Sequence, residues 1–476
     1  MIISIGQRRE RFSDGRVFPG RAKLPLSREV GTRIDLTARR EPRPPNCKQV
    51  TKTACFLGNR SFTALSIGAR QLNRAYTPCD WKNSKYRQSR VYFQIVECWQ
   101  IAFSHSYATR IVICSFLMMA VFSASPGIAE EPRDVISPEL WLRVDKSIDR
   151  GLEYLARRQR ADGSFESPKT GQPGITSLAV LAFLSRGHIP GEGPYGDNLL
   201  RAVDFVCRCQ RKNGLLSAAE PEAQHVHDGA SHAGNYNHAI AGLMLTEVYG
   251  MLSNDRAEPI AATITRALEF TREQQLKPRS NPNEKGGWRY LRSRQDFEAD
   301  ISVTSWQLMF YRSAKNSGFD VPAVFVDDAM DYIRRGFDPQ QNAFTYNLPS
   351  GANRATRGVV GGAIVSLALG GEHQSENVRR AGDWIIKNSF RKYNQGIGPY
   401  HYGAYYCSQA MFQLGGQHWK QFFPALSEVL VNNQGPDGSW SIEADHNGNY
   451  FGQSYTTALA ILALTPAYQL LPIYQR

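Results

Sequence analysis

Six segments of this chain are predicted to be helices with almost no charge, and each follows a more polar, amphipathic helix. The uncharged helices are expected at Ile175–Gly187, Asn237–Gly250, Ile301–Ala314, Gly358–Gly370, Ala404–Gly416 and Tyr455–Tyr468. The amphipathic helices are expected at Leu140–Gln159, Leu199–Gln210, Pro259–Gln275, Pro322–Phe337, Ser375–Phe390 and His418–Gln434. A helix that is apolar all round is buried, whereas a helix with one apolar stripe faces water on its other side. The alternation therefore predicts an all-α fold, an (α/α)6 toroid of six helix hairpins with the uncharged helices inside.

The net charge of +13 does not indicate a nucleic-acid-binding protein, because the positive charge is confined to the first quarter of the chain. Residues 1–129 hold 21 Lys and Arg against 7 Asp and Glu, whereas the remainder holds 35 against 36. Residues 1–109 also lack a sustained apolar periodicity. We expect them to be an N-terminal extension that is disordered, or that is not made because translation starts downstream of Met1. No nucleic acid is expected as a partner.

Residues 110–129 are predicted to be a signal peptide or a membrane anchor. Arg110 precedes nineteen residues without a charge, which end in Gly127-Ile128-Ala129. The small residues at this end are typical of a signal cleavage site. About twenty apolar residues also suffice to span a bilayer, with the basic flank inside. Both alternatives predict that residues 130–476, the toroid, are exported to the periplasm or secreted, and they make a membrane surface a candidate partner.

A short motif recurs where the amphipathic helices end. The fuller copies are Gln159-Arg-Ala-Asp-Gly163-Ser-Phe165, Gln210-Arg-Lys-Asn-Gly214-Leu-Leu216 and Gln434-Gly-Pro-Asp-Gly438-Ser-Trp440. Degenerate copies are Lys285-Gly-Gly287-Trp288, Asn342-Ala-Phe344 and Gln395-Gly-Ile-Gly398. Glycine supplies the left-handed residue past a helix end, and the aromatic residue folds back onto the helix pair. The glutamine is expected to bond free carbonyl groups of its own repeat or of the next one.

This Q-x-x-x-G-x-W pattern resembles the repeat of the squalene–hopene cyclase, oxidosqualene cyclase and protein prenyltransferase superfamily, over roughly residues 138–470. The resemblance implies a toroid that binds an apolar isoprenoid or lipid and, if it is an enzyme, acts as a terpene cyclase or mutase. Protein prenyltransferases hold zinc, but Ala404 and Gln453 stand here where the resemblance implies the thiolate and the histidine. We therefore expect no metal and no other cofactor.

An acidic run, Asp296-Phe-Glu298-Ala-Asp300, precedes the third uncharged helix. Class II terpene cyclases have D-x-D-D-T-A at the matching point, so the resemblance implies Asp300 as the catalytic acid with Glu298 beside it. Here Ile301 replaces the last acid and Ser302 the threonine, which departs from the pattern. An acid that protonates an alkene must be neutral and desolvated. The alternative is structural, with Asp300 as a helix N-cap and Glu298 solvating the loop.

The long loops enter the N-termini of the uncharged helices, so they are expected to gather at one mouth of the ring. Aromatic residues are dense in the segments near this mouth, where they would line a cavity or simply pack. The candidate substrate-binding residues are His238, Trp288, Trp306, Tyr402, Tyr405 and Tyr450. The alternative is that the long loops fill the centre of the ring and leave no cavity for a ligand.

Two other functions remain open from the sequence. One is a non-catalytic binding or scaffold protein on the same fold. The other is a carbohydrate-active toroid, a lyase or hydrolase, which would need two carboxylates facing each other about 5–9.5 Å apart. Asp300 with either Glu443 or Asp445 is the pair predicted for that chemistry.

Overall fold

The computed structural model describes residues 134–220, 229–292, 297–348, 354–444 and 451–475. These residues belong to a unit of the chain that begins at Ala129. The extension 1–109 and the segment 110–129 lie outside the described residues. Within the described ranges, no helix has the length and apolar character that crossing a membrane requires.

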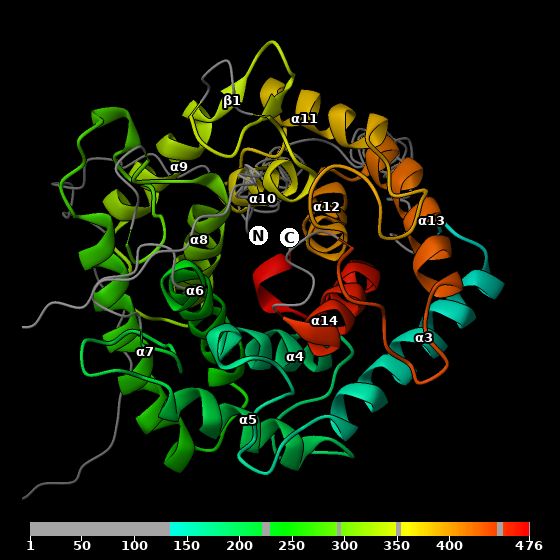
Figure 1. Ribbon diagram of the computed structural model, residues 1–476, viewed down its shortest axis with the longest axis horizontal. Helices are drawn as coiled ribbons and strands as arrows, with labels where there is room; N and C mark the ends of the chain where they lie inside the picture. The colour runs from blue at the N-terminus through cyan, green and yellow to red at the C-terminus, as the bar shows by residue number, and fades with distance from the viewer. Residues whose placement is uncertain (1–133, 221–228, 293–296, 349–353, 445–450, 476) are drawn as a thin grey trace, which may run out of the picture. The chain divides into compact units, whose positions relative to one another are not determined.

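The described residues form twelve α-helices in two concentric layers (Figure 1). The inner helices are α4 (Gly174–Leu184), α6 (Gly229–Tyr249), α8 (Ile301–Asn316), α10 (Arg357–Leu369), α12 (Tyr400–Leu414) and α14 (Gly452–Leu464). The outer helices are α3 (Pro138–Arg157), α5 (Gly196–Arg208), α7 (Asn254–Gln275), α9 (Ala323–Arg335), α11 (Glu376–Lys387) and α13 (Gly416–Asn432). Each inner helix packs against the next inner helix, and α14 packs against α4. The predicted (α/α)6 toroid is therefore confirmed.

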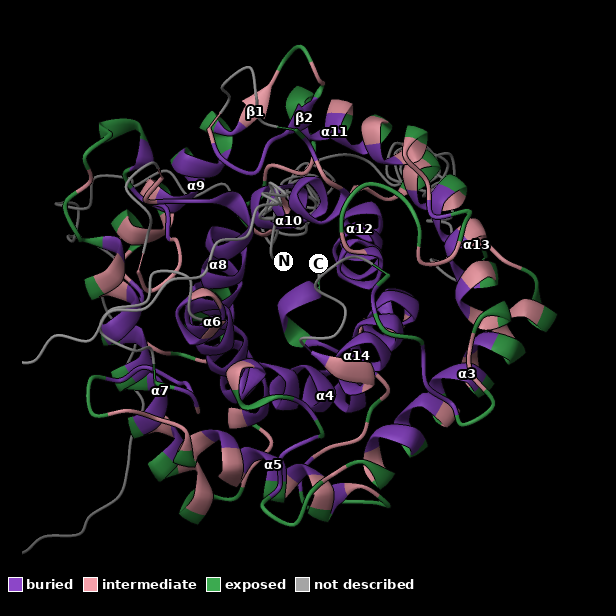
Figure 2. Cartoon of the chain, in the orientation of Figure 1, coloured by how far each residue is buried: buried purple, intermediate pink, exposed green. Residues whose placement is uncertain are grey.

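The charge pattern of the helices matches their burial. Every residue of α4 is buried, whereas α11 buries only Val378, Ala381, Gly382 and Ile385 along one stripe. Figure 2 shows the same contrast around the ring, with buried inner helices and outer helices that expose one face. A helix without charged side chains can be buried between neighbouring helices without desolvating a charge. The hydrophobic effect therefore favours the uncharged helices in the inner layer.

Hydrogen bonds between the two ends of the described chain close the ring. Arg150 of α3 donates from Nη2 to the carbonyl oxygens of Gly435 (2.8 Å) and Pro436 (2.9 Å), just after α13. Gln434 returns a bond from its amide to the carbonyl oxygen of Ser147 at 2.8 Å. The first and last outer helices are therefore neighbours, joined in the same way as consecutive repeats.

The recurring glutamine makes the same two hydrogen bonds in four repeats, three of which were predicted, while Gln275 of the fourth was not. Gln434 Nε2 donates to the carbonyl oxygens of Gly438 and Ser147, each at 2.8 Å. The other three join their own loop to the next outer helix, namely Gln159 to Gly163 and Asn198, Gln210 to Gly214 and Thr263, and Gln275 to Gly286 and Phe325. The glycine acceptors have φ between +88° and +92°. This motif therefore joins each repeat to the next.

The degenerate fourth copy folds as a small hairpin instead. Strand β1 (Phe337–Asp338) pairs antiparallel with β2 (Ala343–Phe344), with Phe337 opposite Phe344. Asn342 takes the left-handed conformation, with φ +54°, where other repeats have glycine. Asparagine is the residue that best replaces glycine there, because its short polar side chain tolerates this conformation.

The C-terminal segment beyond α14 turns back into the ring, which the sequence did not predict (Figure 1, red). Two 3₁₀ turns follow α14, at Pro466–Tyr468 and Pro472–Tyr474. Ile473 donates its backbone N–H to Glu247 Oε2 (3.3 Å), and Gln413 Nε2 donates to the carbonyl oxygen of Tyr474 (3.0 Å). Glu247 and Gln413 are near the C-terminal ends of α6 and α12. The segment therefore closes the end of the ring opposite the mouth.

The stability of this end is expected to depend on pH through Glu247. Burial raises the pKa of Glu247 to about 7, although Ser313 and the Ile473 N–H act against this. A carboxyl group in an unfolded chain has a pKa of about 4.3. The native protein thus binds more protons between these values, and the free energy of unfolding falls as pH rises through about 7. The Tyr405 and Tyr474 hydroxyls also lie near Glu247. Their pKa values are raised above the ordinary value for tyrosine, so they stay protonated in this pH range and do not contribute.

In Glu247→Gln we expect this loss of stability to disappear, because the amide has no proton to release. Urea unfolding of the variant and the parent at a series of pH values from acidic to mildly basic measures the difference. The exposed Glu258→Gln serves as the matched control. A stability difference between Glu247→Gln and parent that is constant with pH would contradict the prediction.

Candidate functional site

Asp300 is the N-cap residue of α8 and is fully buried. Its Oδ1 accepts the backbone N–H of Val303 at 2.7 Å, and its Oδ2 accepts Nη1 of Arg289 at 2.9 Å. The Asp300 side chain is 0% exposed and that of Arg289 is 14% exposed. The carboxylate that the family resemblance implies as a proton donor is therefore held in a buried ion pair.

The ion pair opposes the neutral form of Asp300. The pKa of Asp300 is nevertheless raised above its ordinary value, because the effect of burial exceeds the opposite effects of Arg289 and the Val303 N–H. Burial works against the charge of Arg289, but the Asp300 carboxylate raises the pKa of this guanidinium above its ordinary value. Protonating Asp300 would leave a buried guanidinium without a counter-charge, which is costly. In this structure Asp300 therefore serves as the partner of Arg289 in a buried ion pair.

Three tyrosines surround the ion pair, and we call Tyr236, Tyr290 and Tyr346 the hydroxyl cluster. The Arg289 guanidinium lies 4.5 Å from the ring centre of Tyr290 and 5.3 Å from that of Tyr346. The hydroxyl groups of Tyr290 and Tyr346 are 2.9 Å apart. Tyr236 comes from α6, and the other two come from the loops that lead to α8 and α10. The mouth loops and an inner helix thus combine around one charged pair.

A second group of rings lies in the interior, and we call Trp306, Tyr402, Tyr405 and Tyr406 the aromatic wall. Trp306 of α8 stacks on Tyr405 of α12 with ring centres 5.5 Å apart and an interplanar angle of 13°. Trp306 Nε1 donates to the Tyr402 hydroxyl at 3.1 Å. Helix α10 lies between α8 and α12 in the ring order. Side chains from α8 and α12 that meet must therefore meet inside the ring.

Glycines of α10 allow α12 to approach this closely. A Cβ on Gly358 would lie 2.5 Å from the ring of Tyr402, and one on Gly361 would lie 2.8 Å from the backbone of Tyr406. No real Cβ is found at such distances, so larger residues would displace the tyrosines. The glycines in this uncharged helix thus set the position of the aromatic wall.

Three predicted residues come together in this way, namely Trp306, Tyr402 and Tyr405. Two others lie between the layers of helices. The indole of Trp288 donates to the carbonyl oxygen of Thr271 on α7 at 3.0 Å. His238 accepts the Leu216 N–H on Nδ1 at 3.1 Å, so its Nε2 donates to Thr271 Oγ1 at 2.9 Å.

The role of His238 is that of a threonine in other repeats. Thr176, Thr304 and Thr457 accept the backbone N–H of Phe165, Trp288 and Trp440 in their hydroxyl groups. His238 accepts the equivalent N–H in the second repeat. Burial lowers its pKa to about 3, so the imidazole is neutral. His238 therefore links the two layers and does not face the interior.

Glu298 does not join Asp300. Its Oε2 accepts the backbone N–H of Ser280 at 2.6 Å, and its own N–H donates to Glu284 Oε2 at 2.6 Å. Both partners belong to the loop between α7 and α8. Glu298 thus orders this loop. Tyr450, the last predicted residue, lies outside the described residues.

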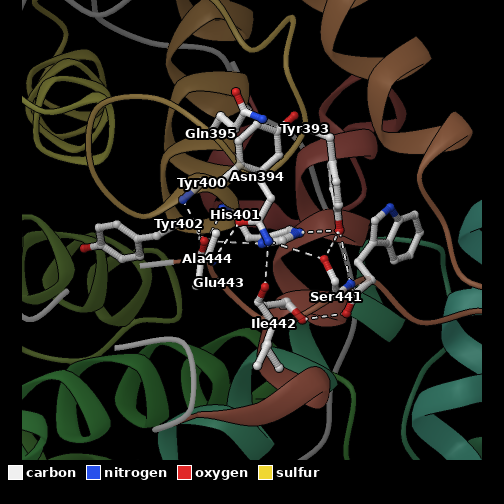
Figure 3. Close-up of polar contacts among 12 residues, drawn as sticks. Tyr393, Asn394, Gln395, Tyr400, His401, Tyr402, Ser441, Ile442, Glu443 and Ala444 are labelled. Carbon is white, nitrogen blue, oxygen red and sulfur yellow. Dashed lines mark hydrogen bonds and ion pairs between the residues drawn. The ribbon is translucent and has the colours of Figure 1, made fainter. Parts of the chain in front are cut away.

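A further polar group lies at the start of α12, where the candidate carboxylate Glu443 meets His401 and Tyr393, which were not predicted (Figure 3). Glu443 accepts the backbone N–H groups of Tyr400 (2.7 Å) and His401 (2.8 Å), and its Oε2 lies 3.5 Å from His401 Nδ1. His401 Nε2 lies 3.2 Å from the Tyr393 hydroxyl. Burial would raise the pKa of Glu443, but His401 and the backbone N–H groups lower it. An ionised carboxylate at a helix N-terminus is favourable, and this one fixes a mouth loop to α12.

The two described carboxylates proposed for carbohydrate chemistry are thus both committed to structural contacts. Asp300, the N-cap of α8, pairs with Arg289 of the preceding loop, and Glu443 caps α12. Asp445 lies outside the described residues. Among the described side chains, no three of His, Cys, Asp and Glu gather to hold a metal ion.

No family model and no curated protein matches the sequence. Among solved structures, the chain is similar to the type II terpene cyclase MstE from Scytonema in complex with geranylgeranyl dihydroxybenzoate (15% identity, 71% of this chain and 100% of that chain, TM-score 0.47). It is also similar to a wild-type glycosidase (11% identity, 71% and 100%, TM-score 0.48) and to a protein from Actinoplanes (16% identity, 68% and 99%, TM-score 0.45). The likeness assigns no activity to this chain.

Proposed function

We propose that this toroid binds an apolar ligand of the isoprenoid or lipid class in its interior, on the aromatic wall. The observation that carries the proposal is the meeting of Trp306, Tyr402 and Tyr405 from two inner helices that are not neighbours. Stacked rings offer a large apolar surface at little entropic cost. The rings contact one another in the structure, so a ligand enters by replacing some of these contacts.

The proposed function is binding without protonation of the ligand. A class II cyclase mechanism would need Asp300 as a neutral acid, but Asp300 is 2.9 Å from the Arg289 guanidinium. The sequence of residues 110–129 supports the further proposal that the toroid works outside the cytoplasm. A lipid dissolved in a nearby membrane would then be within reach of it.

Titration of the full-length protein with farnesene, an isoprenoid hydrocarbon, tests this proposal by isothermal titration calorimetry. We expect saturable binding, and a weakening of about tenfold in Trp306→Ala because a desolvated aromatic surface is lost. Trp288→Ala is the matched control, since Trp288 is also a buried tryptophan but lies between α7 and α8. Circular dichroism of both variants checks that they fold. No binding to the parent, or an equal loss in both variants, would refute an interior site.

A further inference from the structure

Two buried hydrogen-bond donors next to the Asp300–Arg289 pair have no partner among the described residues. One is the hydroxyl group of Tyr236, a residue that is 2% exposed. The other is the Nε–H of Arg289, whose Nη1 is bonded to Asp300. Buried polar groups are nearly always hydrogen-bonded, because an unmade bond costs their full desolvation. Two such donors in one place call for an explanation.

Both donor residues lie beside Tyr290 of the hydroxyl cluster. The ring of Tyr236 lies 6.4 Å from the ring of Tyr290, and the Arg289 guanidinium lies 4.5 Å from that same ring. Burial raises the pKa of Tyr236 well above its usual value, and the proximity of Tyr346 and Asp300 adds to this rise. Tyr236, carried by α6, thus lies beside the ion pair at the start of α8. It lies on the side of the interior where the aromatic wall begins, since Tyr402 is also near it.

The other polar groups of the cluster already have partners. The Tyr290 and Tyr346 hydroxyls bond to each other, and Tyr346 also interacts with the Asp300 carboxylate. The Tyr402 hydroxyl bonds to Ser302 Oγ at 2.7 Å. What the cluster leaves unused is therefore donor capacity. A group that fits must bring an acceptor oxygen.

The net charge of the ion pair indicates that the acceptor group of the ligand is neutral. Asp300 balances the charge of Arg289 at 2.9 Å, so the pair has no net charge. A carboxylate or a phosphate would add an uncompensated negative charge beside a buried aspartate. A carbonyl oxygen accepts two hydrogen bonds without adding a charge.

We propose, on the basis of the proposed function, that the interior ligand carries a neutral carbonyl group whose oxygen accepts hydrogen bonds from Tyr236 and Arg289. The hydrocarbon part of this isoprenoid ketone, quinone or ester lies on the aromatic wall. The hydroxyl cluster thus selects the head of the ligand, and the wall binds its tail. Tyr236 is a specificity-determining residue, with no part in bond making or breaking.

The experiment compares farnesylacetone, an isoprenoid ketone, with farnesene, by calorimetry on the full-length protein. The parent should bind the ketone about tenfold more tightly, because two buried donors gain a partner. In Tyr236→Phe most of this preference should be lost, since only the Arg289 donor remains, while the affinity for farnesene stays unchanged. The unfolding midpoint of Tyr236→Phe without ligand should equal or exceed that of the parent, because an unpartnered hydroxyl has been removed. A merely structural tyrosine would lower it.

Tyr332→Phe is the matched control, since Tyr332 also buries a hydroxyl without a described partner near Asp300 but carries it on the outer helix α9. It should leave the preference for the ketone intact. Equal affinities of the parent for both probes would overturn the inference and leave the interior binding site standing. The same holds if Tyr236→Phe keeps the full preference for the ketone. Binding of neither probe to the parent would overturn both proposals.

Discussion

Gly286→Ala is expected to lower the free energy of unfolding by about 3 kcal/mol or more. Gly286 has a φ of +89°, and a Cβ built on it would lie 2.0 Å from the carbonyl oxygen of Asp328 on α9. That atom is backbone of the next outer helix, which cannot move without breaking the bond between repeats. The cost therefore combines an unfavourable conformation with an overlap that has no easy relief. Urea unfolding followed by circular dichroism measures it.

Gly318→Ala separates the two causes. Gly318 has a φ of +86°, but a Cβ there would meet nothing within 4 Å. We expect this variant to lose only about 1 kcal/mol, the conformational part. Equal losses in the two variants would show that the close approach of neighbouring repeats contributes nothing. A loss of unfolding free energy in Gly286→Ala that greatly exceeds the loss in Gly318→Ala would show that the close contact between neighbouring repeats contributes strongly to stability.

Asp300→Ala is expected to destabilise the protein by about 4 kcal/mol, because it removes the N-cap of α8 and leaves Arg289 buried without a counter-charge. Asp300→Asn keeps an acceptor for the Val303 N–H, so its loss should be smaller. The double variant Asp300→Asn with Arg289→Met removes the orphaned charge as well. It should recover part of the stability that Asp300→Asn loses. Denaturant unfolding of the three variants measures these differences.

These three variants also show whether a loss of function on mutating Asp300 results from lost stability or from the loss of an acid. If Asp300→Ala unfolds at the same urea concentration as the parent, the ion pair does not stabilise the fold. Asp300 would then be free to act as an acid. If the double variant is stable and still binds farnesene, the ion pair serves the structure and not the binding of the hydrocarbon.

The charge alternation was enough to predict which helices are inner and which are outer, and the resemblance of the Q-x-x-x-G-x-W repeats implied that the two layers close into a toroid. The alternation was less informative at α6, which begins at Gly229 and not near Asn237. The polar residues of this first part resemble a loop in sequence. In the structure Asn235 and Asn237 are buried and donate to the carbonyl oxygens of Arg289 and Thr170. Tertiary hydrogen bonds outweighed the local pattern there.

The candidate site was predictable only in part, for a geometric reason. Trp306, Tyr402 and Tyr405 lie on inner helices, and their spacing along these helices turns them towards the interior. Trp288 precedes α8 and follows the fold-back of its repeat into the space beside α7. His238 could have been recognised from its place in the repeat, which other copies fill with threonine. No sequence signal shows that the Tyr236 hydroxyl lacks a partner, so its role needed the structure.

The bonds of Arg150 and Gln434 between α3 and the end of α13 have a consequence for biosynthesis. Ser147 and Gln434 are 287 positions apart, so their contact is absent until nearly the whole polypeptide has left the ribosome. Every shorter nascent chain carries one face of α3 that still lacks its neighbour. Such intermediates expose apolar surface, so this protein should need chaperone protection up to the last hairpin.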